Sequence, residues 1–528
     1  MSKNFSKLFS AELDGIDAKL VEVETDVHAG LHSFNIVGLA DKALSEAKER
    51  VGSALKNIGV KPPSKENRKI VINLAPADLK KTGSHYDLAL ALGYLLATNQ
   101  TKNFDTKDKI FIGELSLEGI ARPVNGVLNI AQLCKKLGFH YLFLPKQNAA
   151  EAAIVDKIKV IPVENLSQLI DHLEGRKEIA TQPKTKIEEW QNDNFIDISE
   201  VKGQGNAKRA LMVAAAGGHN ILMVGSPGAG KTMLAQSLNS ILPPMSLEEI
   251  IEVTQIYSAA SLLKEKSFIN FRPFRSPHHT ASPVAIIGGG QNPRPGEISL
   301  AHRGILFLDE LPEFRRDLLE ALRQPLESGK VFISRVKNNL TLPAKFTLAA
   351  AMNPCPCGYY RDEEKECRCS AFEVFRYQKK VSGPLLDRID IQIDIPRVKI
   401  EQLKKSAAAT ETKNFKEKVI KAREIQKERL DPLKAEARCE PSRPLTGLAS
   451  RKILTNSEMS SKQCDELIHL DAKSEEFLKN VFDRSLISAR GYYRILKTAR
   501  TIADLEESEN VAESHLAEAF GYRLREEK

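Results

Sequence analysis

Residues 221–238 read ILMVGSPGAGKTMLAQSL, and a glycine-rich turn separates two apolar segments in this stretch. The apolar run before the turn predicts a buried strand, and the spacing after it predicts a helix. Glycines let backbone N–H groups converge on phosphate oxygens, and the following helix points its positive end at the same place. The stretch therefore predicts a phosphate-binding loop in an α/β domain. The alternative is a purely structural turn between a strand and a helix.

The turn fits the pattern G-x-x-x-x-G-K-[ST]. Its residues are Gly225, Ser226, Pro227, Gly228, Ala229, Gly230, Lys231 and Thr232. In this pattern the lysine reaches the β- and γ-phosphates of a nucleoside triphosphate, and the hydroxyl holds Mg²⁺. We therefore expect this loop to bind ATP and Mg²⁺.

Two carboxylates follow a second apolar run. Residues 305–308 (ILFL) predict a buried strand, and Asp309 and Glu310 come directly after it. Beside a phosphate loop, one carboxylate at a strand tip organises Mg²⁺ and a neighbouring one polarises the attacking water. We assign the magnesium role to Asp309 and the role of base to Glu310. The alternative is that these charges only terminate a strand.

Three more polar residues stand at positions that suit ATP hydrolysis. Asn353 ends the apolar run 346–352 and is expected to orient the attacking water, or else it only begins a turn. Arg388, in GPLLDRID, is a candidate arginine finger for a neighbouring subunit, with a local ion pair as the alternative. Arg490 opens the helical stretch GYYRILKTARTIADL and is a candidate phosphate sensor, with surface charge as the alternative.

Composition sets the broad class. The chain has 528 residues, 42% hydrophobic and 28% charged, which is typical of a soluble protein with several domains. A net charge of +8 permits an anionic partner without requiring one. The N-terminal residues lack a signal-peptide core, and no apolar run reaches the length of a membrane span. We expect a cytoplasmic protein.

Four of the seven cysteines lie between residues 355 and 369. These are Cys355, Cys357, Cys367 and Cys369, and four thiolates at short spacing suit tetrahedral Zn²⁺. We expect a structural zinc site that braces the strand before Asn353. Two disulfides or four free thiols are the alternatives.

The pattern of predicted elements divides the chain into parts. Residues 1–173 alternate strands and helices and form one α/β domain, and the polar residues 174–196 form a linker. Residues 197–397 alternate strands and helices again and contain the phosphate loop and the cysteine insertion. From residue 398 to the end, helical patterns dominate, which predicts an all-helical lid.

These features together resemble AAA+ ATPases of the magnesium-chelatase-like kind, and within them the YifB/ComM family. The resemblance rests on VKGQGNAKRALMVAAAGGHN, on the long stretch from FRSPHHTAS to LFLDELPEF, and on NPCPCGYY with CRCS. It covers nearly the whole chain. It implies a P-loop AAA+ core, a helical lid, and a homo-oligomeric ring, usually a hexamer, with ATP bound between subunits.

In such a ring Arg388 would serve the neighbour's site, and Arg376 is a second candidate for this role. The resemblance also implies a hairpin before the Asn353 strand, and residues 331–342 (VFISRVKNNLTL) have that form. The hairpin would place Arg335 and Lys337 in the pore near DNA phosphates. Arg294, in the glycine-rich segment 281–297, belongs to a second candidate pore element.

The N-terminal domain resembles the Lon-protease-like fold, also described as ribosomal S5 domain 2-like. Lon proteases need a serine nucleophile and a lysine that activates it. In our alignment the nucleophile position holds His85 and the lysine position holds Leu128, while Ser84 is one place away. We expect a domain without proteolytic activity that serves as a scaffold, an oligomerisation element or a DNA contact.

The resemblance implies a motor that moves single-stranded and branched DNA, with helicase or branch-migration activity that integrates incoming strands during natural transformation, together with recombination proteins. Two alternatives stay open: a protein-remodelling ATPase and a chelatase-type motor that does not act on DNA. Stimulation of ATP hydrolysis by DNA, and its loss with salt, separates these possibilities.

Overall fold

The computed structural model describes residues 4–38, 42–65, 67–81, 83–187, 196–263, 267–290, 294–333, 340–398, 401, 410–430, 453–484 and 488–523. The chain divides into two compact units. The first comprises residues 1–189, 246–270 and 293–295, and the second comprises residues 190–245, 271–292 and 296–528. Within the described residues, no helix is both long enough and apolar enough to cross a membrane.

The first unit contains a sheet of seven strands in the order β3-β4-β2-β1-β5-β8-β9. Strand β2 is antiparallel to both of its neighbours, and the other pairs are parallel. The strands are β1 (Phe5–Asp14), β2 (Asp17–Ala29), β3 (Ser33–Val37), β4 (Arg68–Ala75), β5 (Lys109–Phe111), β8 (Tyr141–Pro145) and β9 (Lys159–Val163). A separate pair is formed by β6 (Glu114–Leu115) and β7 (Ala121–Arg122).

Helices pack against this sheet, and the most apolar of them is buried along its whole length. This helix, α2 (Asp87–Ala97), reads DLALALGYLLA, and all of its residues are buried. The other helices of the unit are α1 (Lys42–Asn57), α3 (Val127–Leu137), α4 (Ala149–Ala152), α5 (Leu166–Leu173) and α8 (Leu247–Ala259).

Helix α8 was placed in the central domain by the sequence pattern, but it belongs to the first unit. It contacts α3, and the Ser258 hydroxyl donates a hydrogen bond to the buried carboxylate of Glu151 (Oγ to Oε1, 2.5 Å). The first half of the predicted linker also joins this unit, because Gln182 and Thr185 donate backbone hydrogen bonds to Val160 and Ala153.

The second unit contains a parallel sheet of five strands in the order β11-β14-β17-β10-β18. The strands are β11 (Phe274–Arg275), β14 (Ile305–Leu308), β17 (Thr347–Met352), β10 (Ile221–Gly225) and β18 (Ile391–Ile395). Strands β10, β14 and β17 are apolar and almost entirely buried, as expected of central parallel strands.

Shorter elements surround this sheet. The helices are α6 (Gly205–Gly217), α7 (Lys231–Ser237), α9 (Pro283–Ile287), α10 (Glu297–Leu300), α11 (Arg316–Ala321), α12 (Arg323–Ser328), α13 (Ala371–Gln378) and α14 (Gly383–Leu386). An antiparallel pair is formed by β15 (Lys330–Ile333) and β16 (Leu340–Pro343). The two-residue strand β12 (Gly288–Gly289) also belongs to this unit, whereas the two-residue strand β13 (Arg294–Pro295) belongs to the first.

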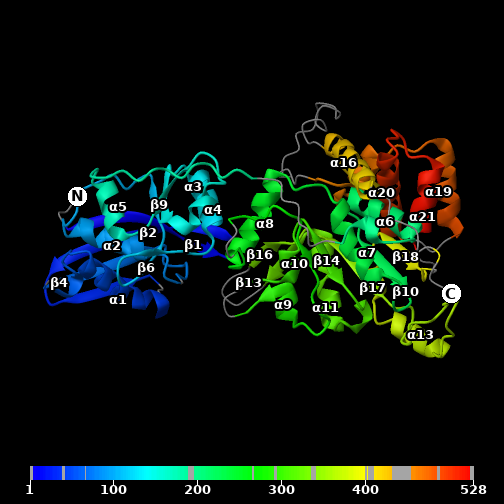
Figure 1. Cartoon of the computed structure of the whole chain (residues 1–528), viewed down its shortest axis with the longest axis horizontal. Coiled ribbons are helices and arrows are strands. Elements are labelled where there is room, and N and C mark those ends of the chain that lie inside the picture. The colour runs from blue at the N-terminus through cyan, green and yellow to red at the C-terminus, as the bar shows by residue number, and fades with distance from the viewer. Residues whose placement is uncertain are drawn as a thin grey trace. The chain divides into compact units, whose positions relative to one another are not determined.

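The described residues after position 410 form helices, in agreement with the predicted helical C-terminal part. They are α16 (Glu411–Arg429), α18 (Ser461–Leu467), α19 (Ala472–Arg484), α20 (Ala489–Leu505) and α21 (Glu513–Gly521). Helices α16 and α20 pack on α6 and on each other, so the helical part shares the core of the parallel sheet (Figure 1). The predicted α/β class with a helical C-terminal part is confirmed.

Candidate active site

Three adjacent parallel strands bring the predicted phosphate loop, carboxylates and amide to one edge of the sheet. In the register of the sheet, Val224 of β10 pairs with Met352 of β17, and Leu308 of β14 pairs with Ala350. Because parallel strands end at the same edge, the residues that follow β10, β14 and β17 lie together. A cavity of about 430 Å³ at this edge is lined by Pro227 to Met233, Asp309, Glu310, Met352 and Asn353.

The first glycine of the loop is needed for a close approach between strands. A Cβ atom on Gly225 would lie 2.4 Å from the backbone oxygen of Ile395 in β18. Any larger residue would therefore push β10 and β18 apart at the point where the chain enters the loop.

Lys231 is the first residue of α7, and its buried side chain folds back onto the loop. Its ammonium group donates hydrogen bonds to the backbone oxygens of Gly225 (2.7 Å) and Ser226 (3.0 Å) and to Oδ1 of Asn353 (3.1 Å). Burial lowers the pKa of Lys231, and the charges of Asp309 and Glu310 act in the opposite direction. The loop therefore holds a cation where phosphate oxygens would converge.

Thr232 and Asp309 form the pair expected of a magnesium site. The Thr232 hydroxyl donates a hydrogen bond to Oδ2 of Asp309 at 2.8 Å, and both side chains line the cavity. A hydroxyl and a carboxylate oxygen are the hard ligands that Mg²⁺ prefers, so these residues fit the ion. When bound, Mg²⁺ would neutralise phosphate charge.

Glu310 is exposed at the same edge. Its backbone has φ = 51°, in the left-handed region that is uncommon for residues other than glycine, and its N–H group donates to Oδ1 of Asp309 (3.0 Å). Nδ1 of His279 lies 3.8 Å from Oε2 of Glu310. Because of this turn the two neighbouring carboxylates differ in environment: Asp309 contacts Thr232, whereas Glu310 is exposed to solvent.

Arg388 and Arg490 do not reach this cavity. Arg388 comes just before β18, and Ile391 of β18 pairs with Ile221 at the start of β10, so Arg388 lies at the opposite edge of the sheet. Its guanidinium lies 2.5 Å from Oε2 of Glu327, and the guanidinium of Arg490 lies 2.9 Å from Oε1 of the same carboxylate. Arg376, the second finger candidate, is exposed on α13.

Sequence patterns did not single out Glu327. It stands in the short helix α12, and its contacts with Arg388 and Arg490 join it to residues that are 61 and 163 positions away. The hydrogen bond from Arg388, opposed by partial burial, lowers the pKa of Glu327. One ionised carboxylate therefore holds both arginines.

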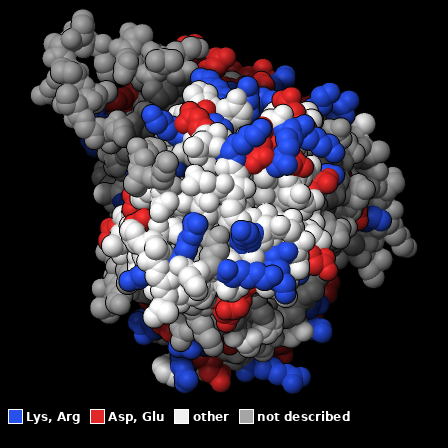
Figure 2. Space-filling view, turned by 90° about the vertical axis from the view of Figure 1, so that its left-hand side faces the viewer, with Lys and Arg blue, Asp and Glu red and all other residues white. Residues whose placement is uncertain are grey.

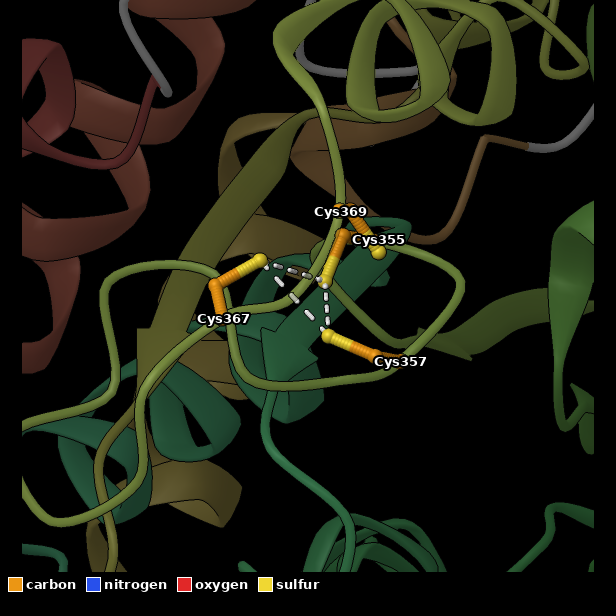
Figure 3. A group of neighbouring side chains, drawn as sticks. All are labelled: Cys355, Cys357, Cys367 and Cys369. Carbon is orange, nitrogen blue, oxygen red and sulfur yellow. Dashed lines mark hydrogen bonds between the residues drawn. The ribbon is translucent and has the colours of Figure 1, made fainter.

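The four predicted cysteine ligands converge on one point (Figure 3). Their sulfur atoms lie within 4.8 Å of one another, and three of the separations are 3.3, 3.7 and 3.6 Å. A tetrahedral zinc with Zn–S bonds of about 2.3 Å requires sulfur atoms about 3.8 Å apart, so this donor set fits zinc. All four cysteines are free thiols in the structure.

Of the DNA-contact candidates, Arg335 and Lys337 lie outside the described residues. The stem of their predicted hairpin is confirmed, since β15 and β16 pair antiparallel with Val331 opposite Leu342. Arg294 is exposed in β13.

Ser84, His85 and Leu128, at or beside the positions that correspond to a protease dyad, make contacts of other kinds. The backbone N–H of Leu128, a buried residue, donates to the Glu151 carboxylate (3.0 Å), and the Ser84 hydroxyl donates to the Glu114 carboxylate. Nε2 of His85 lies 2.9 Å from the backbone oxygen of Ala11. The Ser84 hydroxyl thus faces a carboxylate, and the His85 ring faces a backbone oxygen.

Comparison with known proteins gives three family matches that together cover most of the chain. The family described as magnesium chelatase, subunit ChlI, matches residues 197–403, a second ChlI family matches residues 23–148, and the ChlI C-terminal family matches residues 409–523.

Individual relatives match over nearly their whole length. Competence protein ComM of Haemophilus influenzae is 41% identical over 522 residues, which cover 98% of this chain and 97% of the relative. The YifB proteins of Escherichia coli and Salmonella typhimurium are 38% and 40% identical over 510 residues, which cover 96% of this chain and 95% of each relative.

Proposed function

We propose that this chain, which belongs to the YifB/ComM family of magnesium-chelatase-like AAA+ ATPases, hydrolyses ATP at the interfaces of a homo-oligomeric ring and uses the energy to move DNA. The family matches support an ATPase. Ring assembly, the roles of individual residues and the DNA substrate are the proposal.

The observation that carries the proposed mechanism is the division of the site between two edges of one sheet. Lys231, Thr232 and Asp309 stand where they would bind the phosphates and Mg²⁺, and Glu310 stands where it would polarise water while Asn353 orients it. Arg388 lies at the other edge, which supports action on the ATP of a neighbouring subunit. Because Arg490 shares its carboxylate partner, we propose that it faces that interface as well.

DNA is the partner that the relatives support best, because one of them carries the name competence protein. We propose that single-stranded and branched DNA pass through the ring during natural transformation, in the cytoplasm and with recombination proteins. The hairpin of β15 and β16 would supply pore contacts through Arg335 and Lys337. The glycine-rich segment 281–297 would supply a further contact through Arg294.

The test compares ATP hydrolysis with no DNA, with single-stranded DNA and with a forked duplex at increasing salt. We expect stimulation by both DNA forms and a steep loss of it between 50 and 200 mM salt, because phosphate contacts release counterions. Indifference to DNA together with stimulation by unfolded protein would support the protein-remodelling alternative. Indifference to both would leave the chelatase-type motor.

We further propose that the cysteine cluster binds one structural zinc ion per chain. Four protein ligands leave no open position, so the ion would brace the loop after Asn353 rather than take part in hydrolysis. Atomic spectroscopy of the purified protein should find about one zinc per chain. Replacement of Cys357 by serine should remove it.

The first unit is proposed to be a Lon-protease-like domain without proteolytic activity. The contacts of Ser84, His85 and Leu128 support this proposal. Figure 2 looks on one end of this unit, where lysine and arginine side chains lie among uncharged and acidic ones. Such a mixed face suits contact with DNA or with another subunit, and a peptidase assay of the full chain should find no cleavage.

A further inference from the structure

The segment between the cysteines contacts the phosphate loop through Asp362. This residue lies between Cys357 and Cys367, and its carboxylate accepts a hydrogen bond from the hydroxyl of Ser226, 136 residues earlier in the chain. Ser226 is the second residue of the phosphate loop. The Asp362 side chain is only 2% exposed.

Other groups fix the Asp362 carboxylate. The backbone N–H groups of Glu364 and Lys365 both donate to Oδ1 at 3.0 Å, and Nε of Arg397 lies 3.1 Å from Oδ2. The hydrogen bond from Ser226, opposed by burial, lowers the pKa of Asp362. The carboxylate is therefore an ionised and oriented acceptor rather than a freely rotating surface group.

A second contact joins the same two loops. A Cβ atom on Gly358 would lie 2.6 Å from the ring of Pro227, and Gly358 has φ = 83°. The N–H group of Gly358 donates to the backbone oxygen of Cys355 (3.0 Å), so a hydrogen-bonded turn links Gly358 to the first cysteine of the cluster. Two successive residues of the phosphate loop thus rest on the segment that the cysteines enclose.

We propose that Asp362 is a positioning residue for nucleotide binding, which ties the phosphate loop to the cysteine-bounded segment. Ser226 and Pro227 precede the glycines whose N–H groups must converge on phosphate, so holding them fixes the entrance of the loop. The inference rests on the proposed ATP and zinc sites. It implies that zinc occupancy sets the affinity for nucleotide.

The first experiment is a double-mutant cycle on the full chain with Ser226→Ala, Asp362→Ala and the double variant. Binding of a fluorescent ADP analogue gives Kd, and steady-state hydrolysis gives kcat and KM. We expect each single variant to weaken binding about tenfold, with KM rising and kcat changing less than about twofold, and the double variant to be no weaker than either single one. Additive losses would overturn the proposal.

Glu364→Ala is the matched control. Glu364 also pairs with Arg397, at 3.3 Å, so that among the described residues its side chain is engaged with this arginine rather than with the phosphate loop. Its Kd should equal that of the unmodified chain. An equal loss in this variant would mean that the local charge, rather than the contact with Ser226, governs binding.

The second experiment removes zinc with a chelator and measures metal content and ADP affinity together. Chelation should weaken binding to the unmodified chain about tenfold and leave Asp362→Ala unchanged, because that variant has already lost the tie. An equal loss in both proteins would overturn the link to zinc. If the unmodified chain bound neither zinc nor ATP, the proposed zinc and ATP sites themselves would be contradicted. The response of ATP hydrolysis to DNA is a separate test, and its failure would not affect the proposed role of Asp362.

Discussion

At the carboxyl edge of the parallel sheet, Lys231 contacts Asn353 and Thr232 contacts Asp309, all within a single chain. At the amino edge, Arg388 and Arg490 are joined through the carboxylate of Glu327. In the proposed mechanism the first edge binds phosphate and Mg²⁺, and the second supplies cations that stabilise charge during phosphoryl transfer. If the proposed roles hold, one chain carries both halves of an ATPase site at opposite ends of its parallel strands, and each half would serve a different neighbouring subunit.

Lys231→Ala breaks the first half and should have the largest effect. Without the ammonium group, phosphate charge stays uncompensated in a buried loop, and ATP hydrolysis should fall on the order of a thousandfold or more. Turnover measured by phosphate release checks this. Lys462→Ala, at a surface lysine with 78% exposure, should leave turnover unchanged.

Arg388→Ala breaks the second half and tests whether the two halves belong to different subunits. Turnover should fall about a thousandfold, as expected for an arginine finger. Mixing this variant with Lys231→Ala should restore activity, because about a quarter of randomly formed interfaces then combine two intact halves. If the mixture stays inactive while Arg376→Ala alone is equally inactive, Arg376 is the finger.

Glu310→Gln separates binding from hydrolysis at the first edge. The amide cannot accept the proton of the attacking water, so kcat should fall about a hundred- to ten-thousandfold. The Kd for ATP should change little, because the contacts of Lys231 and Thr232 remain. Equal losses in affinity and in kcat would show that Glu310 holds the loop rather than the water.

Glu327→Gln tests the carboxylate that holds Arg388 and Arg490 at the amino edge, and its effect should be smaller than those above. A neutral amide holds both arginines less firmly, and turnover should fall about three- to tenfold with the Kd for ATP unchanged. Because the hydrogen bond from Arg388 lowers the pKa of Glu327, the carboxylate keeps its charge throughout the neutral pH range. The ratio of variant to unmodified turnover should therefore be constant between pH 6 and 8, and a ratio that changes in this range would contradict the assignment.

The first edge was predictable from sequence because each of its residues directly follows an apolar run or a glycine-rich turn. Parallel strands then bring Thr232, Asp309 and Asn353 together without further information. The cysteine cluster was predictable for a similar reason, since its four thiols lie within fifteen residues of one another, from 355 to 369.

Glu327 and Asp362 were not predictable, because each acquires its role from a residue that lies far away in the chain. Neither stands in a motif, and charged residues in a short helix or a loop are usually solvated. The grouping of α8 with the first compact unit could not be predicted for another reason. The apolar positions of a helix show that it packs against a core, but they do not show which core.

The placement of α8 has a practical consequence for dissecting the molecule. The chain enters the first unit, continues into the ATPase sheet, returns at residue 246 to add a helix to the first unit, and leaves again at residue 270. Cutting at residue 190 therefore would not yield two autonomous pieces. The excised ATPase fragment would carry α8 without α3, and the fragment before the cut would expose the apolar residues against which Ile251 and Phe268 pack. Both would be expected to aggregate unless residues 246–270 were joined to the first fragment.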